Sequence, residues 1–276
     1  MAATAQLPPT ARPRSPHALL GRLMCAPPDP VAEGVALLRG GAFRAMNVLL
    51  VDEPDGAGVV VFDTGEAGMA PGILAAARRR GGISRVVLGH GDTDHRGAAP
   101  AIARAGGAGD GPHGARGAIP IECHADAVPH AEGRGGRDYW RPELLPGAVR
   151  RFHGVMHHVW DGGPVRITGT VAAGDDVAGF EVIELPGPAP GLIGLWRARD
   201  RVALVSDAFY VTDMWGRPQD PAVPLPAYNH DTEQARESLR ALAALEPRVV
   251  VPGHLGPLVG DDLRERLERA ADALVG

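Results

Sequence analysis

Four polar side chains each come directly after a short apolar run, at the point where a strand would end. They are Asp63 after residues 59–62, His90 after residues 86–88, Asp207 after residues 202–205 and His254 after residues 249–251. A rigid strand that ends in a carboxylate or an imidazole holds that group at the rim of its sheet, where active sites form. Four such endings in one chain predict a shared site at the ends of strands.

The densest group of chemically active residues is the segment His90-Gly91-Asp92-Thr93-Asp94-His95. In a tight loop alternate residues can point the same way, and the neighbours Asp94 and His95 can turn toward one ion. Mixed imidazole and carboxylate donors suit Zn²⁺, and also Fe²⁺ or Mn²⁺. The alternative is a polar turn in which Asp94 caps a helix. The pattern favours the metal site.

Short strands interspersed with helices must position these residues. Apolar runs predict strands at residues 45–51, 58–62, 86–88, 119–123, 165–167, 180–185, 192–196, 202–206 and 249–251. The first two runs flank a Glu-Pro-Asp-Gly turn and predict a hairpin. Helical patterns occur at residues 70–80, 98–105, 233–246 and 261–275. Asp231 or Thr232 can cap the third of these helices.

Residues 129–163 show weak periodicity and many turn residues, which predicts a loop-rich excursion without a clear helix. No repeat or linker divides the chain. Strands dominate both halves, with helices spaced between them. We therefore expect the α/β class, with sheets packed between helices rather than a regular alternation of strand and helix.

Composition narrows the classes of function. Hydrophobic residues make up 45% and charged residues 22% of the 276 positions, which is ordinary for a globular protein. The net charge is −5 and no long basic run stands out, so a nucleic-acid partner is disfavoured. All 28 basic residues are arginine, a bias typical of a GC-rich genome.

No apolar run approaches the length of about 20 residues that a membrane helix needs. Residues 1–30 are rich in Ala, Pro and Arg, and we expect a mostly disordered or extended segment without a secretory signal. A single domain is expected at residues 31–276. Cys25 and Cys123 have no Cys-x-x-Cys spacing and are interpreted as reduced thiols. These features favour a cytoplasmic protein.

The segment from His90 to His95 resembles the H-x-H-x-D-H signature of the metallo-β-lactamase superfamily. Three further motifs match in the family's order: Asp63-Thr64-Gly65 its Asp-x-Gly, Ser206-Asp207-Ala208 its Gly-Asp-Ala, and Pro252-Gly253-His254 its Pro-Gly-His. The resemblance covers about residues 42–260. It implies a four-layer αββα sandwich with the site along one edge, between the two sheets. Residues 196–257 are most similar to the lactonase and glyoxalase II-like branch.

The resemblance implies two metal positions, of which the first is altered here. In such enzymes the first metal is held by both histidines of H-x-H and by a later histidine. His90 is kept, but Asp92 stands in place of the second histidine and Pro188 in place of the later one. Asp92 can still coordinate, with changed geometry and ligand hardness, whereas proline offers no ligand.

The second metal position is intact. The family's pattern places this metal at Asp94, His95 and His254, with Asp207 bridging between the two metals. We therefore expect one tight ion, zinc first and iron or manganese as alternatives, with the first position weak or empty.

The resemblance also implies how the site would work. An ion with an open coordination position lowers the pKa of its bound water to about 7 and so provides a metal-bound hydroxide. Asp92 or Asp94 would take a proton from that water. Tyr210 lies where lactonases place a tyrosine that binds the substrate carbonyl, with rim packing as the alternative. Asp63 is expected to act indirectly, by fixing the loop or a ligand imidazole.

Further histidines fall outside these motifs. His124 follows a strand, and a structural role is favoured over pocket lining. His153 and His157 have the i, i+4 spacing of metal ligands, but with His158 they lie in the expected excursion and are interpreted as solvent-exposed. His230 is interpreted as a turn residue, although the resemblance places its loop near the substrate.

Aromatic residues are scarce, at 4% of the chain, yet four of them lie close together in the excursion. They are Tyr139, Trp140, Phe152 and Trp160. The group forms either a lid or wall against an apolar substrate or a satellite core.

The function favoured by these features is hydrolysis of an ester, lactone or thioester of a small molecule. One alternative is a non-hydrolytic tailoring enzyme of specialised metabolism, a lyase, cyclase or dehydratase in which a lone metal stabilises an enolate. A second alternative is a non-catalytic binding protein, against which the four retained ligands argue. The expected partner is a small-molecule substrate, with neither nucleic acid nor membrane, and a homodimer is left open.

Overall fold

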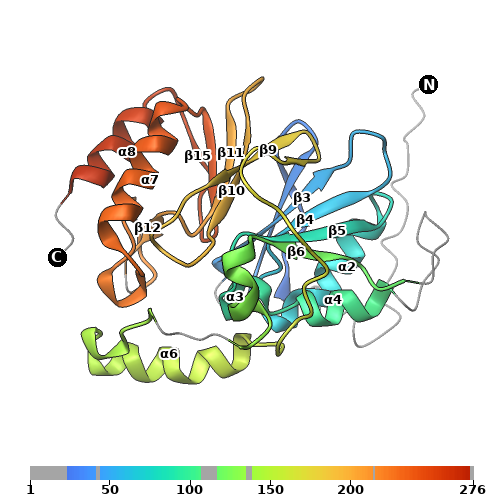
Figure 1. Ribbon diagram of the computed structural model, residues 1–276, viewed down its shortest axis with the longest axis horizontal. Helices are drawn as coiled ribbons and strands as arrows, with labels where there is room; N and C mark the ends of the chain where they lie inside the picture. The colour runs from blue at the N-terminus through green and yellow to red at the C-terminus, as the bar shows by residue number, and fades with distance from the viewer. Residues whose placement is uncertain (1–23, 42–43, 107–116, 135–138, 214, 274–276) are drawn as a thin grey trace, which may run out of the picture.

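The computed structural model describes residues 24–41, 44–106, 117–134, 139–213 and 215–273. The described chain forms two sheets that lie face to face between layers of helices (Figure 1). The expected disorder of the N-terminal segment lies outside the described residues, apart from its last positions. The strand β1 begins at Asp29, just ahead of the expected domain boundary.

The first sheet contains seven strands within the described residues, in the order β1-β2-β3-β4-β5-β6-β7. Their bounds are β1 Asp29–Ala32, β2 Val35–Gly40, β3 Met46–Asp52, β4 Val59–Phe62, β5 Ile83–Leu88, β6 Ile121–Cys123 and β7 Gly169–Thr170. The strands from β1 to β4 pair antiparallel, and those from β4 to β7 pair parallel.

The second sheet contains six strands of the described chain, in the order β15-β14-β11-β10-β9-β8. Their bounds are β8 Asp176–Val177, β9 Phe180–Glu184, β10 Ile193–Arg197, β11 Val202–Ser206, β14 Val249–Pro252 and β15 Leu258–Val259. Only β11 and β14 pair parallel among these described strands. A separate ribbon pairs β12 (Tyr210–Thr212) with β13 (Pro218–Ala222).

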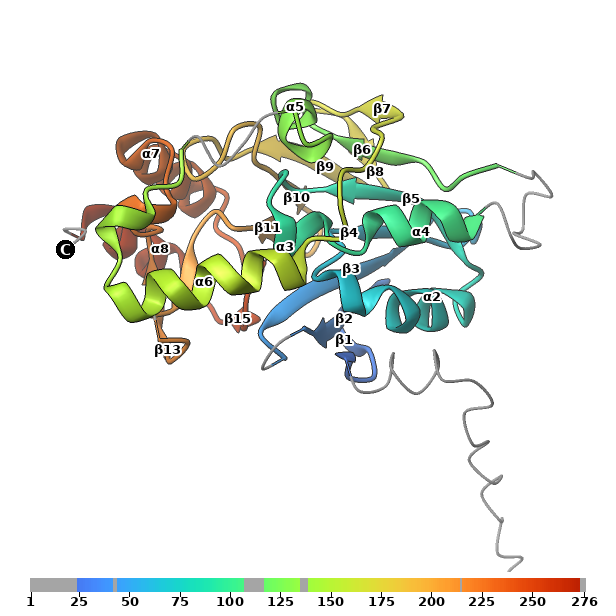
Figure 2. The same cartoon turned by 90° about the horizontal axis from the view of Figure 1, so that it is seen from below.

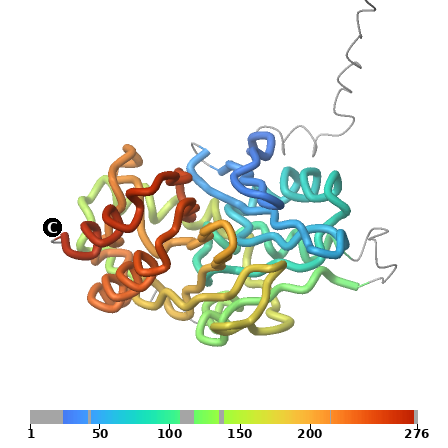
Figure 3. The backbone as a smooth tube through the Cα atoms, turned by 90° about the horizontal axis from the view of Figure 1, so that it is seen from above, coloured from blue at the N-terminus to red at the C-terminus, as the bar shows by residue number. Residues whose placement is uncertain are grey.

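Helices cover both outer faces and connect the sheets. The α-helices are α2 Ala70–Arg78, α3 Thr93–Arg96, α4 Ala99–Gly106, α5 Val128–Ala131, α6 Gly147–Trp160, α7 Thr232–Ala244 and α8 Leu263–Asp272. The short 3-10 helices are η2 Ala67–Met69, η3 Ala125–Ala127, η4 Pro142–Leu144 and η5 Pro226–Tyr228. Seen from above, α7 and α8 lie at one end of the molecule and α2 at the other (Figure 3).

Three apolar cores hold the layers together because successive strand residues point to opposite faces. In β2, Val35 and Leu37 face the second sheet, whereas Ala36 and Leu38 face the helix layer of α2 and α4. The middle core joins the inner faces of the two sheets, and Phe180 on β9 is fully buried there. A third core packs α7 and α8 on the second sheet. The four-layer αββα sandwich is thus confirmed.

Most of the predicted elements are confirmed. The expected hairpin is the antiparallel pair β3 and β4, and the predicted strand at residues 202–206 is β11. Asp231 caps α7, where its Oδ1 accepts hydrogen bonds from the backbone N–H groups of Glu233 at 3.0 Å and Gln234 at 3.1 Å. Among the described residues no helix is both long and apolar enough to cross a membrane.

Three predictions of local structure are wrong. Residues 129–163 were expected to contain no clear helix, yet α6 spans 14 residues there. No strand forms at residues 165–167, and the chain joins the sheet only at β7. The strands β1 and β2 precede residue 42, where strands were expected to begin. The sequence of α6 hides it because its glycines and β-branched residues have low helix propensity.

The helix α6 lies across the side of the molecule on which the two halves meet (Figures 1 and 2). At its N-terminal end, Val149 packs with Leu145 and Ala227. At its C-terminal end it contacts η2 and α3, next to the predicted metal loop. It therefore bridges the halves above the predicted site.

Candidate metal centre and active-site cleft

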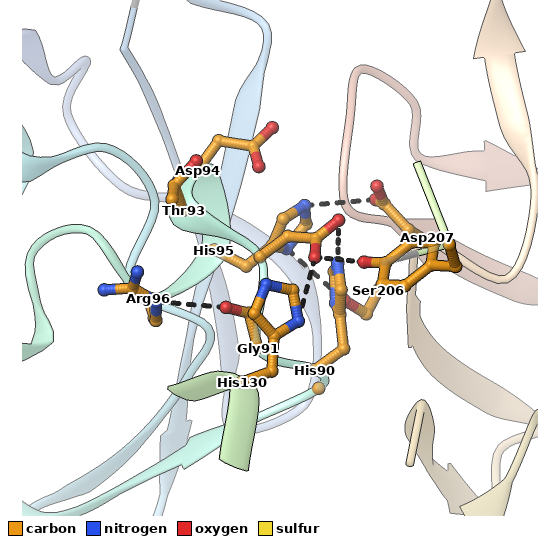
Figure 4. A network of polar contacts seen from close by, with 12 residues as sticks. His90, Gly91, Thr93, Asp94, His95, Arg96, His130, Ser206 and Asp207 are labelled. Carbon is orange, nitrogen blue, oxygen red and sulfur yellow. Dashed lines mark hydrogen bonds and ion pairs between the residues drawn. The ribbon is translucent and has the colours of Figure 1, made fainter. Parts of the chain in front are cut away.

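The four strands that precede the predicted site residues end at a common rim. Asp63 follows β4 and His90 lies just past β5, and these two strands are parallel neighbours in the first sheet. Asp207 follows β11 and His254 lies just past β14, parallel neighbours in the second sheet. Since the carboxyl ends of parallel strands meet at the same edge, the two sheets bring these residues together. Figure 4 shows His90 and Asp207, one from each sheet.

Asp63 holds the imidazole of His95 in one orientation. The Asp63 Oδ2 atom lies 2.9 Å from His95 Nδ1 and accepts a hydrogen bond from Ser206 Oγ at 2.7 Å. Its other oxygen accepts from the Gly89 N–H at 2.7 Å. With the Nδ1 proton directed at Asp63, the neutral form of His95 would present its Nε2 lone pair to an ion in the site.

Ser206 connects the two histidines of the motif. Its hydroxyl donates to Asp63, so it accepts from His90 Nδ1, which lies 3.1 Å away. Asp63 and Ser206 both have left-handed backbone conformations, with φ of 57° and 46°. Non-glycine residues adopt this region only when their surroundings enforce it. The backbone at both strand ends therefore serves to aim these side chains.

Two groups of side chains in the described chain could hold a metal ion. One is His90, His95 and Asp207, and the other is Asp94, His95 and His254. Within each group the ligand atoms lie within 4.8 Å of one another. His95 belongs to both groups, and its ring centroid lies 4.2 Å from that of His90 and 5.3 Å from that of His254.

The ligand atoms of His95 and Asp207 are better placed to coordinate a metal ion than to form a hydrogen bond with each other. His95 Nε2 and Asp207 Oδ1 are 3.2 Å apart, yet both are buried and have no aligned hydrogen-bond partner. Burying a polar atom without a hydrogen-bond partner costs free energy of folding. Coordination of an ion by that atom removes this cost. A Cβ atom at Gly253 would collide with both side chains, so glycine is required beside them. These residues can therefore accommodate a divalent ion.

The electrostatics of the site favour a bound cation. Burial alone would lower the pKa of His95, but Asp207 and Asp63 outweigh it and raise this pKa well above its ordinary value. Burial opposes ionisation of Asp207, yet His95 and His254 hold the pKa of Asp207 well below its usual range. A proton on His95 thus balances the carboxylates in the absence of an ion, and a divalent ion would displace that proton.

Asp92 belongs to neither of these groups, and other side chains face both of its carboxylate oxygens. Tyr139 donates a hydrogen bond to Asp92 Oδ1, and His130 Nδ1 lies 3.4 Å from the same oxygen. The other oxygen lies 3.5 Å from His90 Nε2. Burial opposes ionisation of Asp92, but His90 first, and then His130 and Tyr139, keep its pKa below the ordinary range.

The neighbours of Asp92 were not identified from the sequence. Tyr139 stood out only as one of several clustered aromatics, and nothing in the sequence around His130 marks it. The role of Asp92 as a ligand stays a prediction. Pro188, at the place of the family's later histidine, lies in the turn after β9, where its carbonyl accepts from the His230 N–H at 3.1 Å.

Tyr210 stands beside His254, in the candidate metal group formed by Asp94, His95 and His254. Its ring meets that of His254 edge to face, with the centroids 5.8 Å apart. Burial and then the carboxylates Asp207 and Asp94 raise the pKa of Tyr210 well above its ordinary value. The phenol therefore stays protonated and can donate a hydrogen bond to a substrate oxygen. Its catalytic role remains a prediction.

A cleft of about 940 Å³ opens from the candidate metal group. It is lined by Asp94, Asp207, Tyr210 and His254 on the metal side and by α6 and the loops around η5 and β12 on the other sides. Such a volume is typical of a small-molecule site.

The helix α6 is fastened directly to the metal loop. Buried Arg96 donates to Asp161 Oδ1 at 2.9 Å and to the Gly91 carbonyl at 3.0 Å. Thr93 Oγ1 lies 3.0 Å from His157 Nδ1. A residue between the predicted ligands therefore contacts the helix that forms a wall of the cleft.

The other histidines divide between cleft and surface. His153 and His157 line the cleft and are half-buried, so the prediction that they are solvent-exposed is wrong. His158 is exposed, as expected. His124 caps η3, where its Nδ1 accepts from the Asp126 N–H at 3.2 Å, and does not line this cleft. His230 is exposed, with its ring 6.2 Å from that of Tyr139.

Comparison with known proteins supports the interpretation of these motifs. Residues 42–254 match the family model described as the metallo-β-lactamase superfamily. The chain is 27% identical over 258 residues to the probable metallo-hydrolase YflN of Bacillus subtilis strain 168, covering 88% of this chain and 92% of that one.

Solved structures share the fold at lower identity. A metallo-β-lactamase family protein of Thermus thermophilus has a TM-score of 0.60 and 22% identity, covering 87% of this chain and 79% of that one. A β-lactamase domain protein of Burkholderia ambifaria has a TM-score of 0.59 and 20% identity, covering 88% and 74%. TTHA1623, described in a di-iron-bound form, has a TM-score of 0.56 and 22% identity, covering 80% and 93%.

Proposed function

The chain belongs to the metallo-β-lactamase superfamily and is a metal-dependent hydrolase, and we propose that its substrate is a small-molecule ester, lactone or thioester. The observation that carries this proposal is the pair of buried ligand atoms His95 Nε2 and Asp207 Oδ1, which lack an aligned hydrogen-bond partner. Ligand atoms of Asp94 and His254 lie within 4.8 Å of an atom of His95, and the group opens onto the cleft.

A divalent ion in this group, when bound, supplies a Lewis acid that polarises a carbonyl and lowers the pKa of water. The protein would supply the remaining functions. Asp63 fixes the orientation of His95 through Nδ1. Tyr210, protonated because burial raises its pKa, donates to the substrate carbonyl oxygen. Asp94, or Asp92 beside His90, would accept a proton from water.

We infer that the site holds one tight ion rather than two. Asp92 already accepts from Tyr139 and faces His90 and His130, so coordination would require it to give up these partners. Pro188 offers no side-chain donor. Zinc suits the mixed imidazole and carboxylate set, and iron or manganese is the alternative. One structurally similar protein is described in a di-iron-bound form, which supports testing iron alongside zinc.

Neither the binding protein nor the non-hydrolytic enzyme is favoured by the site. A non-catalytic binding protein disagrees with the match to a hydrolase family and with the retained ligands. A lyase, cyclase or dehydratase is motivated by the altered first position, but no contact in the cleft specifically favours such a step. The small-molecule partner is supported by the cleft. Cytoplasmic location and a homodimer stay predictions.

Hydrolysis is tested with zinc- and iron-loaded protein acting on phenyl acetate and δ-valerolactone in ¹⁸O-labelled water. The proposal predicts one labelled oxygen in each released acid. It also predicts that Asp94→Asn loses both the ion and the activity. Asp126→Asn is the matched control, because the Asp126 side chain is 75% exposed and lies outside the site. Absence of turnover for loaded wild-type protein would contradict the proposal.

A further inference from the structure

We propose that the cleft selects uncharged substrates that carry an aromatic ring, and that the wall formed by α6 and its neighbours binds this ring. The inference rests on the proposed function for the reaction, but its ligand preference is decided by the cleft walls. Two independent features support it: the aromatic lining and the distribution of charge.

The aromatic residues of the chain are concentrated around this cleft. All three tyrosines and three of the four tryptophans line it. Away from the candidate metal group the wall consists of Tyr139, Trp140, Phe152, Trp160, Trp215 and Tyr228. Because a chain with 4% aromatic residues places half of them on this wall, apolar and ring-shaped ligands are the chemistry that the wall fits.

The rings are arranged as a platform. Trp140 stacks on Tyr228 with an interplanar angle of 18° and a centroid distance of 6.4 Å. His157 meets Trp140 edge to face at 4.5 Å and Trp160 at 5.4 Å. Aromatic pairs gain from such offset and edge-to-face contacts, and a substrate ring can extend the same pattern. Trp215 is 58% exposed, so a ligand that covers it removes apolar surface from water.

The charge distribution excludes recognition of an anion. No arginine occurs among the described residues that line the cleft, and the chain contains no lysine. The lining carboxylates are Glu66, Asp92, Asp94, Asp207 and Asp213. A bound divalent ion would balance Asp94 and Asp207, and His90 and His130 face Asp92. Away from the metal position, phosphate or carboxylate groups of a substrate would therefore find no arginine or lysine partner among the described lining residues.

His153 of α6 does not add a positive charge to this wall. Burial lowers the pKa of His153, so its ring is neutral at neutral pH and acts as part of the apolar wall. Uncharged ligands lose little on entering such an environment, whereas an isolated charge pays a large desolvation cost. The wall thus discriminates against charge as well as favouring rings.

Binding of three matched ketones to zinc-loaded protein tests the inference without turnover. The probes are 5-phenylpentan-2-one, 4-(4-oxopentyl)benzoate and 4-(4-oxopentyl)-N,N,N-trimethylanilinium. They share one ketone chain and differ only in the para substituent of the ring, which is hydrogen, a carboxylate or a trimethylammonium group. The Kd measured by calorimetry is expected to be lowest for the neutral ketone. It should be roughly tenfold lower than the Kd of the carboxylate. Trp140→Leu should weaken binding of the neutral ketone, raising its Kd by about threefold to tenfold.

A pair of arginine substitutions on α6 provides the matched control. His153→Arg places a guanidinium on the cleft wall and should reverse the preference between the neutral ketone and the carboxylate. Val155→Arg adds the same charge on the solvent face, where Val155 is 64% exposed, and should leave the preference unchanged. Equal or tighter binding of the carboxylate or the trimethylanilinium by wild-type protein would overturn the inference. Failure to hydrolyse esters would instead overturn the proposed function, since the ketones report binding alone.

Discussion

At the scale of single residues, the site depends on one carboxylate that need not touch the ion. Asp63 accepts from His95, Ser206 and the Gly89 N–H, so it orients a ligand and joins the ends of β4, β5 and β11. The position of Asp63 at a strand end was predicted from the sequence. Its hydrogen-bond partners could not be, because they depend on how the two sheets pack together.

Asp63→Asn is expected to lower zinc affinity by about 10- to 100-fold, because the amide NH₂ would oppose the proton on His95 Nδ1. The measurement is competition with a fluorescent zinc chelator. Asp52→Asn is the matched control, since Asp52 also ends a strand but pairs with half-buried Arg80 at 2.6 Å, away from the site. Unchanged affinity in Asp63→Asn would show that His95 needs no such partner.

The ionisation of His95 predicts how stability depends on pH. Its pKa is raised in the ion-free protein, as is that of His254, mainly through Asp207. Their stabilising contribution is complete below the unfolded value of about 6.5 and is lost as pH rises through the raised values. A bound ion requires deprotonated histidines, so its contribution grows with pH.

The difference in Tm between zinc-loaded and zinc-free protein should therefore widen from pH 6 to pH 8.5. The range stops there because burial raises the pKa of Cys25 and Cys123 to about 12, while the unfolded thiols ionise at lower pH. Thermal unfolding across this range is the measurement. A difference that narrows with pH would contradict the assignment of His95 as a ligand.

At the scale of elements, α6 is the part that sequence patterns missed. Its apolar residues share one face at helical spacing, yet Val149 on that face is buried while Val155 and Val159 are exposed. Its glycines and β-branched residues lower its helix propensity, so its sequence is a weak helix signal in spite of this amphipathic pattern. By contrast α7, with Ala235, Leu239 and Leu242 buried on one face and Asp231 as its cap, was predictable.

The attachment of α6 through Arg96 and Asp161 can be weakened selectively. Asp161→Asn should increase hydrogen exchange across residues 147–160 and raise KM more than it lowers kcat, because the cleft wall loses its anchor. Its cost to stability should be about 1.5–3 kcal/mol, as for a charged hydrogen bond.

Asp200→Asn is the matched control for this anchor. Asp200 is 32% exposed and Asp161 29% exposed, and each pairs with a buried arginine. The control should lose similar stability with no change in exchange across α6. Equal exchange of α6 in both variants would mean that the Arg96–Asp161 contact does not hold the wall in place.

At the scale of the whole molecule, the layers could be predicted because they follow from residue patterns within single strands. Alternating apolar residues in strands such as β2 and β11 specify which faces are buried, and motifs at the strand ends specify which edge carries the site. The neighbours of Asp92 could not be predicted, because Tyr139 and His130 reach it from segments distant in sequence.

The middle core predicts which phenylalanine stabilises the sandwich. Phe180 is fully buried between the sheets, and the Arg197 guanidinium carbon lies 4.3 Å from its ring centroid. Phe180→Ala should reduce the free energy of unfolding by about 3–5 kcal/mol. Phe152→Ala, where the ring is 46% exposed, should change it by about 0.5 kcal/mol or less. Urea unfolding of both variants is the measurement, and similar losses would contradict the layered core.

The metal content per chain tests the central claim most directly. Elemental analysis of protein purified without added metal or chelator, and again after reconstitution with zinc or iron, should give one ion per chain. The ion should be lost in Asp94→Asn and retained in Asp126→Asn. Two ions per chain would contradict the account, because Asp92 would then have to leave Tyr139 and His130 to complete a second site. No ion after reconstitution would contradict it as well.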